Sequence, residues 1–242
     1  MTTKSKRWRH ALGLYGFFGG VLLGMFFAAL LAWANFEASL FDASTDSSAL
    51  NLENLKCPVL LNRQETGVVF ATFTNSADWK LTRTVDAHIT HGSVLLTREE
   101  RSRFELAPGE KHTLQWPISP EEAAWGRFIF VRLHVQRSAP LPPRTGSCGV
   151  LVVNLPYGSG AQIAAVTIGV SLLLMGGGAI LWVRGLAAQN KNMRALDYLI
   201  LALAPATLLS LLCGIMGFWL GSGVLLLVTI LLTISAVASA LS

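Results

Sequence analysis

Four long runs of apolar residues divide the sequence into membrane and non-membrane parts. They extend over residues 11–33, 161–183, 196–216 and 224–241. Each run is close to the roughly 20 residues that cross a bilayer as an α-helix. A long polar stretch separates the first run from the second, whereas the other connections are short. The pattern predicts one transmembrane helix, one large domain and then a cluster of three transmembrane helices.

Within the polar stretch, apolar and polar residues alternate in short segments that are typical of half-buried β-strands. In residues 81–90, for example, Val85, Ala87 and Ile89 share one face, whereas Asp86 and His88 share the other. Seven strands of this kind are expected, at 58–62, 67–74, 81–90, 93–97, 111–118, 128–136 and 148–155. Their number and spacing predict an antiparallel β-sandwich over residues 57–156, preceded by a linker at 34–56.

Two segments of this domain resemble a known class of modules. Residues 104–114, Phe-Glu-Leu-Ala-Pro-Gly-Glu-Lys-His-Thr-Leu, resemble the strand, Ala-Pro-Gly-Glu turn and strand of bacterial immunoglobulin-like sandwiches. Residues 69–76 resemble their second strand, which ends in a Thr-Asn-Ser turn. The resemblance covers residues 57–156 and implies an immunoglobulin-like fold. Such modules include adhesins, secretion subunits and complex accessories, so it implies no chemistry.

Composition and charge agree with a membrane protein and give its orientation. The chain is 52% hydrophobic and 14% charged, with a mean hydropathy of +0.50, too apolar for a soluble globule. Basic residues concentrate before the first run and in the loop at 184–195, which places both segments in the cytoplasm. These residues are Lys4, Lys6, Arg7, Arg9, Arg184, Lys191 and Arg194.

The fold class expected from these patterns is therefore an integral membrane protein of mixed type. Four transmembrane α-helices carry an extracytoplasmic antiparallel β-sandwich between the first and the second, and both termini are cytoplasmic. Without the basic residues that set orientation, the outer domain has a net charge near −1, counted from the sequence. The sequence pI of about 9.4 thus does not predict nucleic-acid binding.

The N-terminus has a second interpretation, as a cleaved signal peptide. Residues 4–10 are basic, and Ala32-Trp33-Ala34 has the small-x-small form of a cleavage site. The apolar run is longer than a secretory core, however, and places Gly16, Gly20, Gly24 and Ala28 four residues apart, which favours a retained helix. The outer domain contains no Asn-x-Ser/Thr sequon, which is typical of a bacterial inner or plasma membrane.

Small residues at four-residue spacing recur in the later runs and predict a tight helix bundle or a partner-facing surface. Besides the four positions of the first run, the expected packing residues are Ala165, Gly169, Gly177, Ala202, Ala206, Ser210 and Gly214. A compositional explanation remains open, because glycine and alanine are common in membrane helices. Tryptophans 8, 33, 182 and 219 fall at predicted membrane ends, where an interfacial belt is expected.

The cysteines suggest one disulfide bond. Cys57 and Cys148 open the first and last expected strands, and an extracytoplasmic location favours their oxidation. Two separate buried thiols are the alternative. Cys213, within the third run, is interpreted as a small packing residue.

No catalytic motif is present in the sequence, and no cofactor or metal is expected. His88, His134 and Asp86 form the one metal cluster worth weighing, but they lack the close spacing of a ligand motif. The acidic pairs at 99–100 and 121–122 are expected on loops, as solvated charge. The leading hypothesis is therefore a non-enzymatic protein whose partners are the lipid bilayer and other membrane subunits, as an accessory or assembly subunit of a membrane complex.

A small transporter or channel formed by the last three helices is the alternative. The glycines at 176–178 and Pro205 are expected to loosen or kink these helices. Transport helices usually carry ionisable groups at membrane depth, and none is expected here.

Overall fold

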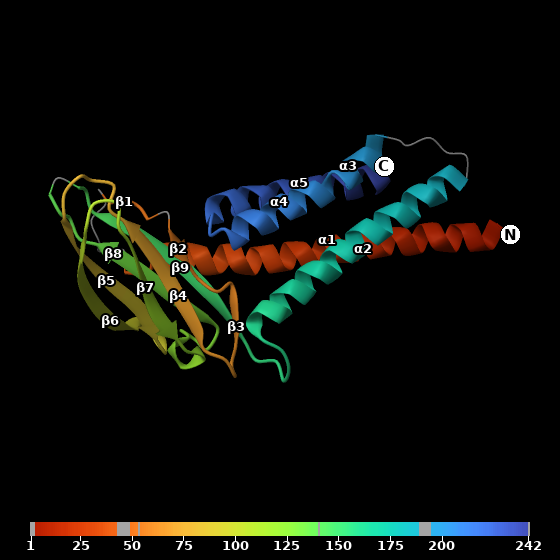
Figure 1. Cartoon of the computed structure of the whole chain (residues 1–242). Coiled ribbons are helices and arrows are strands. Elements are labelled where there is room, and N and C mark those ends of the chain that lie inside the picture. The colour runs from red at the N-terminus through yellow and green to blue at the C-terminus, as the bar shows by residue number, and fades with distance from the viewer. Residues whose placement is uncertain (1–2, 43–48, 53, 140, 189–194, 242) are drawn as a thin grey trace. The chain divides into compact units, whose positions relative to one another are not determined.

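The computed structural model describes residues 3–42, 49–52, 54–139, 141–188 and 195–241 (Figure 1). The chain divides into two compact units, one made of Met1–Ala32 with Ala164–Ser242 and the other of Trp33–Ile163. The first unit is helical and the second holds the strands. Helix α1 (Thr3–Leu40) contributes residues to both.

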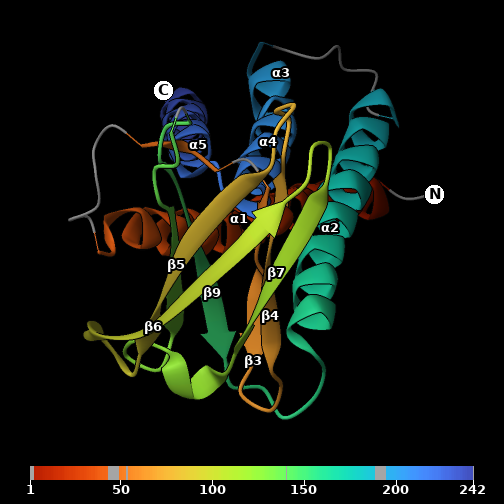
Figure 2. The same cartoon turned by 60° about the vertical axis from the view of Figure 1, so that its left-hand side comes forward.

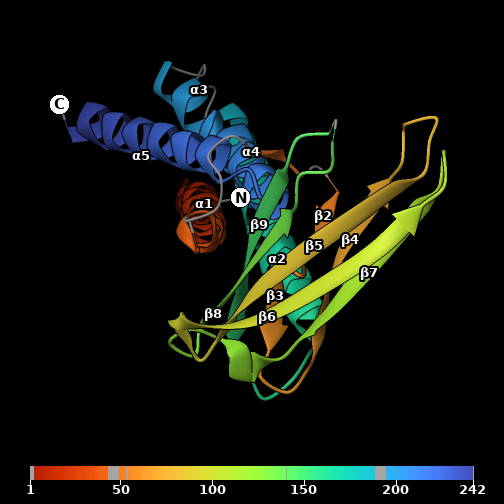
Figure 3. The ribbon, with the colours of Figure 1, turned by 90° about the vertical axis from the view of Figure 1, so that its left-hand side faces the viewer.

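The strands of the second unit form two sheets (Figures 2 and 3). The six-stranded sheet has the order β1-β9-β8-β5-β6, with β3 paired in parallel to β9. The three-stranded sheet has the order β2-β4-β7. The strands are β1 (Leu50–Asn51), β2 (Leu55–Lys56), β3 (Leu60–Asn62), β4 (Gly67–Thr74), β5 (Leu81–His91), β6 (Ser93–Leu106), β7 (Lys111–Ile118), β8 (Phe128–Val135) and β9 (Arg144–Val153).

Alternating apolar residues from both sheets make the core of this β-sandwich. Val85, Ala87 and Ile89 are fully buried, as their alternation predicted, and Trp116 of β7 is the largest fully buried side chain. Cys57 and Cys148 form a disulfide bond with a Cα–Cα distance of 6.5 Å. Cys57 directly follows β2 and Cys148 lies in β9, so the bond links the two sheets.

Strand β6 differs most from the sequence prediction. It was expected to end at residue 97 but continues to Leu106, so Glu99 and Glu100 lie on a strand rather than on a loop. Its charged residues hid the alternation. β6 pairs only with β5 and is therefore an edge strand, where charged side chains are tolerated because they discourage pairing with other chains.

The two turns that carry the immunoglobulin-like resemblance meet at the buried side chain of Asn75. Asn75 is fully buried, and its amide donates hydrogen bonds to the carbonyls of Trp79, Leu106 and Ala107 at 2.8–3.1 Å. Gly109, with a φ of 75°, donates its N–H to the Asn75 carbonyl at 2.9 Å. The Thr-Asn-Ser and Ala-Pro-Gly-Glu turns therefore support each other.

The remaining helices are α2 (Gly160–Ala188), α3 (Ala195–Leu201), α4 (Leu203–Ile215) and α5 (Trp219–Leu241). Two helical segments, Ala11–Leu40 and Gly160–Gly185, are long and apolar enough to cross a membrane, whereas Leu203–Ile215 and Trp219–Ser235 are shorter apolar helices.

Two expectations about helix distortion had different outcomes. The third predicted span is interrupted at Ala202, between α3 and α4, because Pro205 has no N–H for the carbonyl four residues earlier. The glycines at 176–178, in contrast, do not interrupt helix α2, which is continuous from Gly160 to Ala188. Asp197 lies in the first turn of α3, and the third predicted span therefore does contain one ionisable residue.

Helices α4 and α5 form an antiparallel hairpin (Figure 1). The turn contains Gly217 at a φ of 77°. Ser210 and Ser222 face each other across the hairpin, and each hydroxyl donates to the carbonyl of the other residue, at 3.1 and 3.0 Å. Both side chains are fully buried, so paired hydroxyls hold the two helices together.

Candidate functional site

Three glycines of α1 allow its backbone to touch neighbouring helices; we call Gly13, Gly20 and Gly24 the glycine seam. A Cβ atom on Gly20 would lie 2.6 Å from the backbone nitrogen of Met175 in α2. On Gly24 it would lie 2.8 Å from a Thr207 methyl group in α4, and on Gly13 2.6 Å from the nitrogen of Trp182. At Gly13 and Gly20 the close neighbours are backbone atoms, so these two contacts require glycine, whereas Gly24 packs closely against side chains.

One hydrogen bond accompanies the seam. The Ser171 hydroxyl donates to the Gly20 carbonyl at 2.8 Å, and Ser171 is fully buried. Gly178 completes the contact, because a Cβ there would collide with the backbone of Phe17. Helix α1 is therefore in direct backbone contact with α2 within the helical unit.

Of the other predicted packing residues, those of α1 and α4 are at least partly buried. Ala28, Ser210 and Gly214 are buried, and a Cβ on Gly16 would make an ordinary contact at 3.8 Å with the Cα of Gly178. Ala206 is half-buried.

The stripe predicted for α2 makes no close contact within the described chain. A Cβ atom placed on Gly169 or Gly177 would meet no other atom within 4 Å, and Ala165 is exposed; Ala202, in the break before α4, is exposed as well. The packing face of α2 instead contains Ser171, Met175, Gly178 and Trp182. These residues follow helical spacing, but only two of them are small, so a search for small residues missed the face.

Trp182, which was expected in an interfacial belt, is buried within its own helical unit. It is 2% exposed and packs against Phe17, with ring centroids 6.4 Å apart. Trp8 and Trp33, in contrast, are exposed.

In the second unit, the last part of α1 lies on the outer face of the six-stranded sheet; we call residues 33–42 with this face the helix-docking face. The main chain of Ala34 occupies the space where a Gly149 side chain would be. The Asn35 side chain accepts a hydrogen bond from the Gly149 N–H at 3.2 Å. Phe41 packs against Phe130 of β8, with ring centroids 6.1 Å apart. Residues 34–40, which were expected to be part of a linker, are therefore helical and belong to the unit that holds the β-sandwich.

Polar side chains of the sheet bind the end of this helix. Arg132 of β8 donates from Nη1 to the carbonyls of Ser39, at 3.3 Å, and Phe41, at 2.9 Å. The last carbonyls of a helix generally lack partners within it, and a cation also suits the negative end of the helix dipole. The Nδ1 atom of His88 in β5 forms a hydrogen bond with the Asp42 carboxylate. Burial lowers the pKa of Arg132, and the Asp42 charge opposes that shift.

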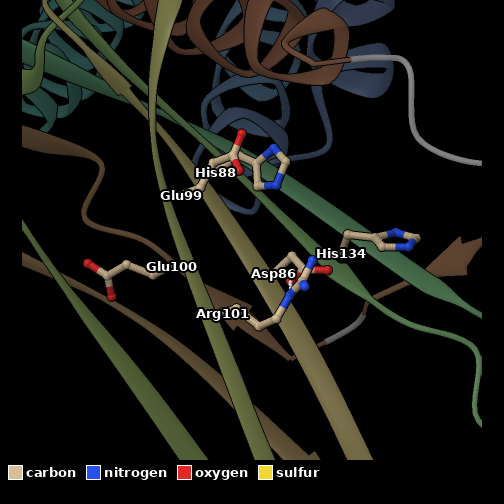
Figure 4. Close-up of a pocket in the computed structure, with 6 residues that line it drawn as sticks. All are labelled: Asp86, His88, Glu99, Glu100, Arg101 and His134. Carbon is tan, nitrogen blue, oxygen red and sulfur yellow. Dashed lines mark hydrogen bonds and ion pairs between the residues drawn. The ribbon is translucent and has the colours of Figure 1, made fainter.

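A polar hollow of about 440 Å³ lies beside the docked helix end, lined by Asp86, His88, Glu99, Glu100, Arg101 and His134 (Figure 4). The Asp86 carboxylate accepts hydrogen bonds from Arg101, at 2.5 Å, and from Gln136, at 2.8 Å. Burial raises the pKa of Asp86, but these two hydrogen bonds and the Arg101 charge outweigh it, so the pKa lies below its usual range. Asp86 is therefore a paired anion at neutral pH.

This geometry does not support the metal hypothesis. His88 is engaged by Asp42, and Asp86 by a cation and an amide. Across the described part of the chain, no three His, Cys, Asp or Glu side chains are grouped as metal ligands. The arrangement can position a helix end and present charge, and we assign it no reaction.

The acidic pair at 121–122 also differs from expectation. Glu122 is buried and lies 2.7 Å from the Arg98 guanidinium, and its carboxylate accepts a hydrogen bond from the Ser119 N–H. Glu122 therefore forms a structural ion pair with Arg98. The neighbouring Glu121 is exposed, although the two acids look alike in the sequence.

Comparison with known proteins identifies no family. No family model matches the sequence, and no curated protein matches it. Among solved structures, the CARDB domain of the PF1109 protein from Pyrococcus furiosus, crystallised with di-metal ions, is 13% identical, with a TM-score of 0.34, over 42% of this chain and 90% of that one.

Two enzymes match over a small share of their own length. A cycloisomaltooligosaccharide glucanotransferase from Paenibacillus sp. is 12% identical, with a TM-score of 0.31, over 46% of this chain and 15% of the enzyme. A β-glucosidase from Listeria innocua is 18% identical, with a TM-score of 0.30, over 44% and 16%. Scores this low carry no functional argument, and the sandwich assignment rests on the strand pairing above.

Proposed function

We propose that this protein is a non-enzymatic, multi-pass membrane protein that acts through protein–protein interaction, as an accessory or assembly subunit of a membrane complex. The observation that carries the proposal is the glycine seam. A helix that serves only as an anchor needs an apolar surface, whereas α1 has backbone contacts with α2 that tolerate no side chain. Helix α1 thus has a specific place among other helices.

The proposal includes four transmembrane helices. Besides α1 and α2, helices α3 and α4 together run from Ala195 to Ile215, and α5 runs from Trp219 to Leu241. Both stretches match the roughly 20 residues that cross a bilayer. The basic residues at the ends of the predicted spans put both termini and residues 184–195 in the cytoplasm under this proposal, and the β-sandwich outside.

A cysteine-labelling experiment tests this topology. Pro120→Cys and Asn190→Cys are introduced separately into a Cys213→Ala background, where Cys57 and Cys148 remain bonded. An impermeant thiol reagent added outside intact cells is expected to label position 120 and spare position 190 until the membrane is opened. Labelling in the reverse order would overturn the proposed orientation.

The outward faces of the helices indicate how partners would bind. Leu173 of α2 and Val224 of α5 are among many large apolar side chains exposed on this unit. A bilayer satisfies such surfaces, and so does another membrane helix. In the absence of strong hydrophobic drive within lipid, the partner interface would rely on shape.

Native co-purification tests the interaction. The full chain, purified in mild detergent and analysed by quantitative mass spectrometry, is expected to bring down partners in fixed stoichiometry. A variant in which residues 11–32 are replaced by an unrelated transmembrane helix should remain in the membrane but lose them. A monodisperse chain without companions, or a swapped chain that keeps all of them, would contradict the proposal.

A small transporter or channel is the second candidate, and one observation favours it. The interruption at Ala202, with Asp197 in the preceding short helix α3, gives a broken helix of the kind that lines transport sites. Proteoliposomes containing the purified chain would show solute or ion flux, and an Asp197→Asn variant would reduce it. Liposomes that stay tight across a broad panel of solutes would eliminate this candidate.

A further inference from the structure

The β-sandwich has a second hollow at the end where β5 and β9 begin. It has a volume of about 210 Å³ and is lined by residues of both sheets. Its wall combines apolar side chains such as Leu81 with polar ones such as Asn54 and Ser76, and with two cations, Arg83 and Arg144. It is separate from the polar hollow beside the helix-docking face, because the two share no lining residue.

Both arginines occupy strand positions on the core-facing side, at the edge of the core, where Arg83 is half-buried and Arg144 is exposed. Arg83 is two residues before the buried Val85 on β5 and so shares its face. Arg144 lies opposite Val135 on β8, which in turn lies opposite Val85. Val85 and Val135 are buried in the core. Arg83 and Arg144 therefore share one face of the sheet with the buried Val85 and Val135.

Their charge is not balanced by the described part of the chain, which excludes Glu53. Neither arginine has an ion-pair partner there. Arg83 Nη1 is buried and has no hydrogen-bond partner. Burial lowers the pKa of Arg83, and repulsion from Arg144 lowers it further. Burying a cation beside another cation costs free energy, which an anion in the hollow would offset.

The walls of the hollow are held in place before any ligand binds. Asn75 fixes the turn after β4 through its three carbonyl contacts. The Ser138 hydroxyl donates to the Thr82 carbonyl at 3.0 Å, and Ser138 also pairs with Leu141. A site that is already ordered loses less entropy when it binds.

We propose that this hollow binds a carboxylate carried on a short apolar body. A guanidinium group matches a carboxylate through two parallel N–H donors. The apolar part of the lining, which includes Phe73 and Leu141, can contact the methylene groups of such a ligand. Inorganic phosphate has no apolar group that could make this contact. The carboxylate belongs either to a small organic acid or to an acidic side chain of a partner protein, and the chemistry of recognition is the same.

Calorimetric titration of the full chain in detergent tests the site with four probes. These are butyrate, inorganic phosphate, a blocked peptide with one glutamate, and the same peptide with glutamine. Binding of butyrate or the glutamate peptide is expected, with no binding of the glutamine peptide and weaker binding of phosphate. Butyrate binding alone indicates a small acid, and peptide binding indicates a partner protein. No binding by either carboxylate, or equal binding of phosphate, would overturn the proposal.

Variants separate binding from folding. Arg144 is exposed, so the Arg144→Gln variant should fold. Its affinity for the carboxylate ligand should fall roughly ten-fold, the loss expected for one charge-assisted contact. Arg127→Gln, an exposed arginine outside the hollow, should leave affinity unchanged. Arg83→Met should keep or raise Tm without ligand and abolish the rise in Tm that butyrate produces. Wild-type affinity in Arg144→Gln would show that the two arginines form no site.

Discussion

The helical unit and the β-sandwich both bring backbone segments into direct contact, but they stabilise those contacts differently. In the helical unit, glycines of α1 meet the backbone of α2, and one serine hydroxyl crosses the contact. In the sandwich, alternating apolar residues are removed from water, and a disulfide joins the sheets. Lipid supplies little hydrophobic drive between helices, so shape decides there, whereas burial of apolar area decides in the sandwich.

The two units also treat polar groups differently. The buried hydroxyls of Ser210 and Ser222 form a local pair within one hairpin. The sandwich uses side chains to satisfy main-chain groups that are far apart in sequence, as Asn35 does for Gly149 and Arg132 does for the end of α1. The polar groups of the sandwich therefore position segments, and those of the helices support contacts that shape already permits.

The largest effect is expected when the disulfide bond, which only the sandwich has, is removed. Replacing Cys57 and Cys148 with alanine opens a loop with a sequence separation of 91 residues, which should cost about 4–5 kcal/mol in the chain-entropy model. The loss should appear in the unfolding of the sandwich in urea, followed by tryptophan fluorescence, to which the buried Trp116 contributes. Cys213→Ala in α4 is the control and should leave the sandwich unchanged. Equal stability of the double variant and wild type would mean that the bond contributes nothing.

A second prediction sharpens the role of shape within the helices. Gly20→Leu should destabilise the helical unit by about 1–3 kcal/mol, by analogy with overpacked cores, because its side chain has no room beside Met175. Gly177→Ala, on the open side of α2, should be neutral or stabilise by up to about 1 kcal/mol through helix propensity. Unfolding in sodium dodecyl sulfate, followed by circular dichroism, measures both. A similar loss in both variants would show that position on the helix does not matter.

A third prediction addresses the helix-docking face. Asn35→Ala leaves the buried Gly149 N–H without its side-chain acceptor, which should cost about 1–3 kcal/mol. Hydrogen exchange should quicken at Gly149 and in residues 33–40 while the glycine seam stays protected. Glu37→Ala, a half-buried neighbour on the same helix, serves as the control. Unchanged exchange at Gly149 would remove Asn35 from the account of helix docking.

The smallest expected effect is the pH dependence of Asp86. Its folded pKa is below the ordinary value, so its contribution to stability is present above the unfolded pKa of about 4 and is lost as pH falls through the folded pKa. Wild type should exceed Asp86→Asn in Tm at pH 7, and the difference should shrink towards pH 3. A difference that stays constant over this range would show that the Asp86 charge contributes nothing.

Sequence patterns determined the parts of this protein in which each residue depends on its neighbours along the chain. Apolar alternation located β4 and β7, and length and hydropathy located α1 and α2. Pro205 predicted a distortion of the third span, and this span is interrupted at Ala202, three residues before the proline. Local sterics and periodicity act over a few residues, so they can be read directly from the sequence.

Tertiary structure decided what depends on contacts between distant segments. Helix α1 continues to Leu40, and Arg132 of β8 donates hydrogen bonds to the Ser39 and Phe41 carbonyls at this end. The sequence of residues 33–42 does not predict this contact. Gly149 and Gly178 look like any other glycines in the sequence, and only the segments packed against them make a side chain impossible. Arg83 and Arg144 lie far apart in the chain, and strand pairing alone places them in one hollow, because cross-strand register is set by the whole sheet.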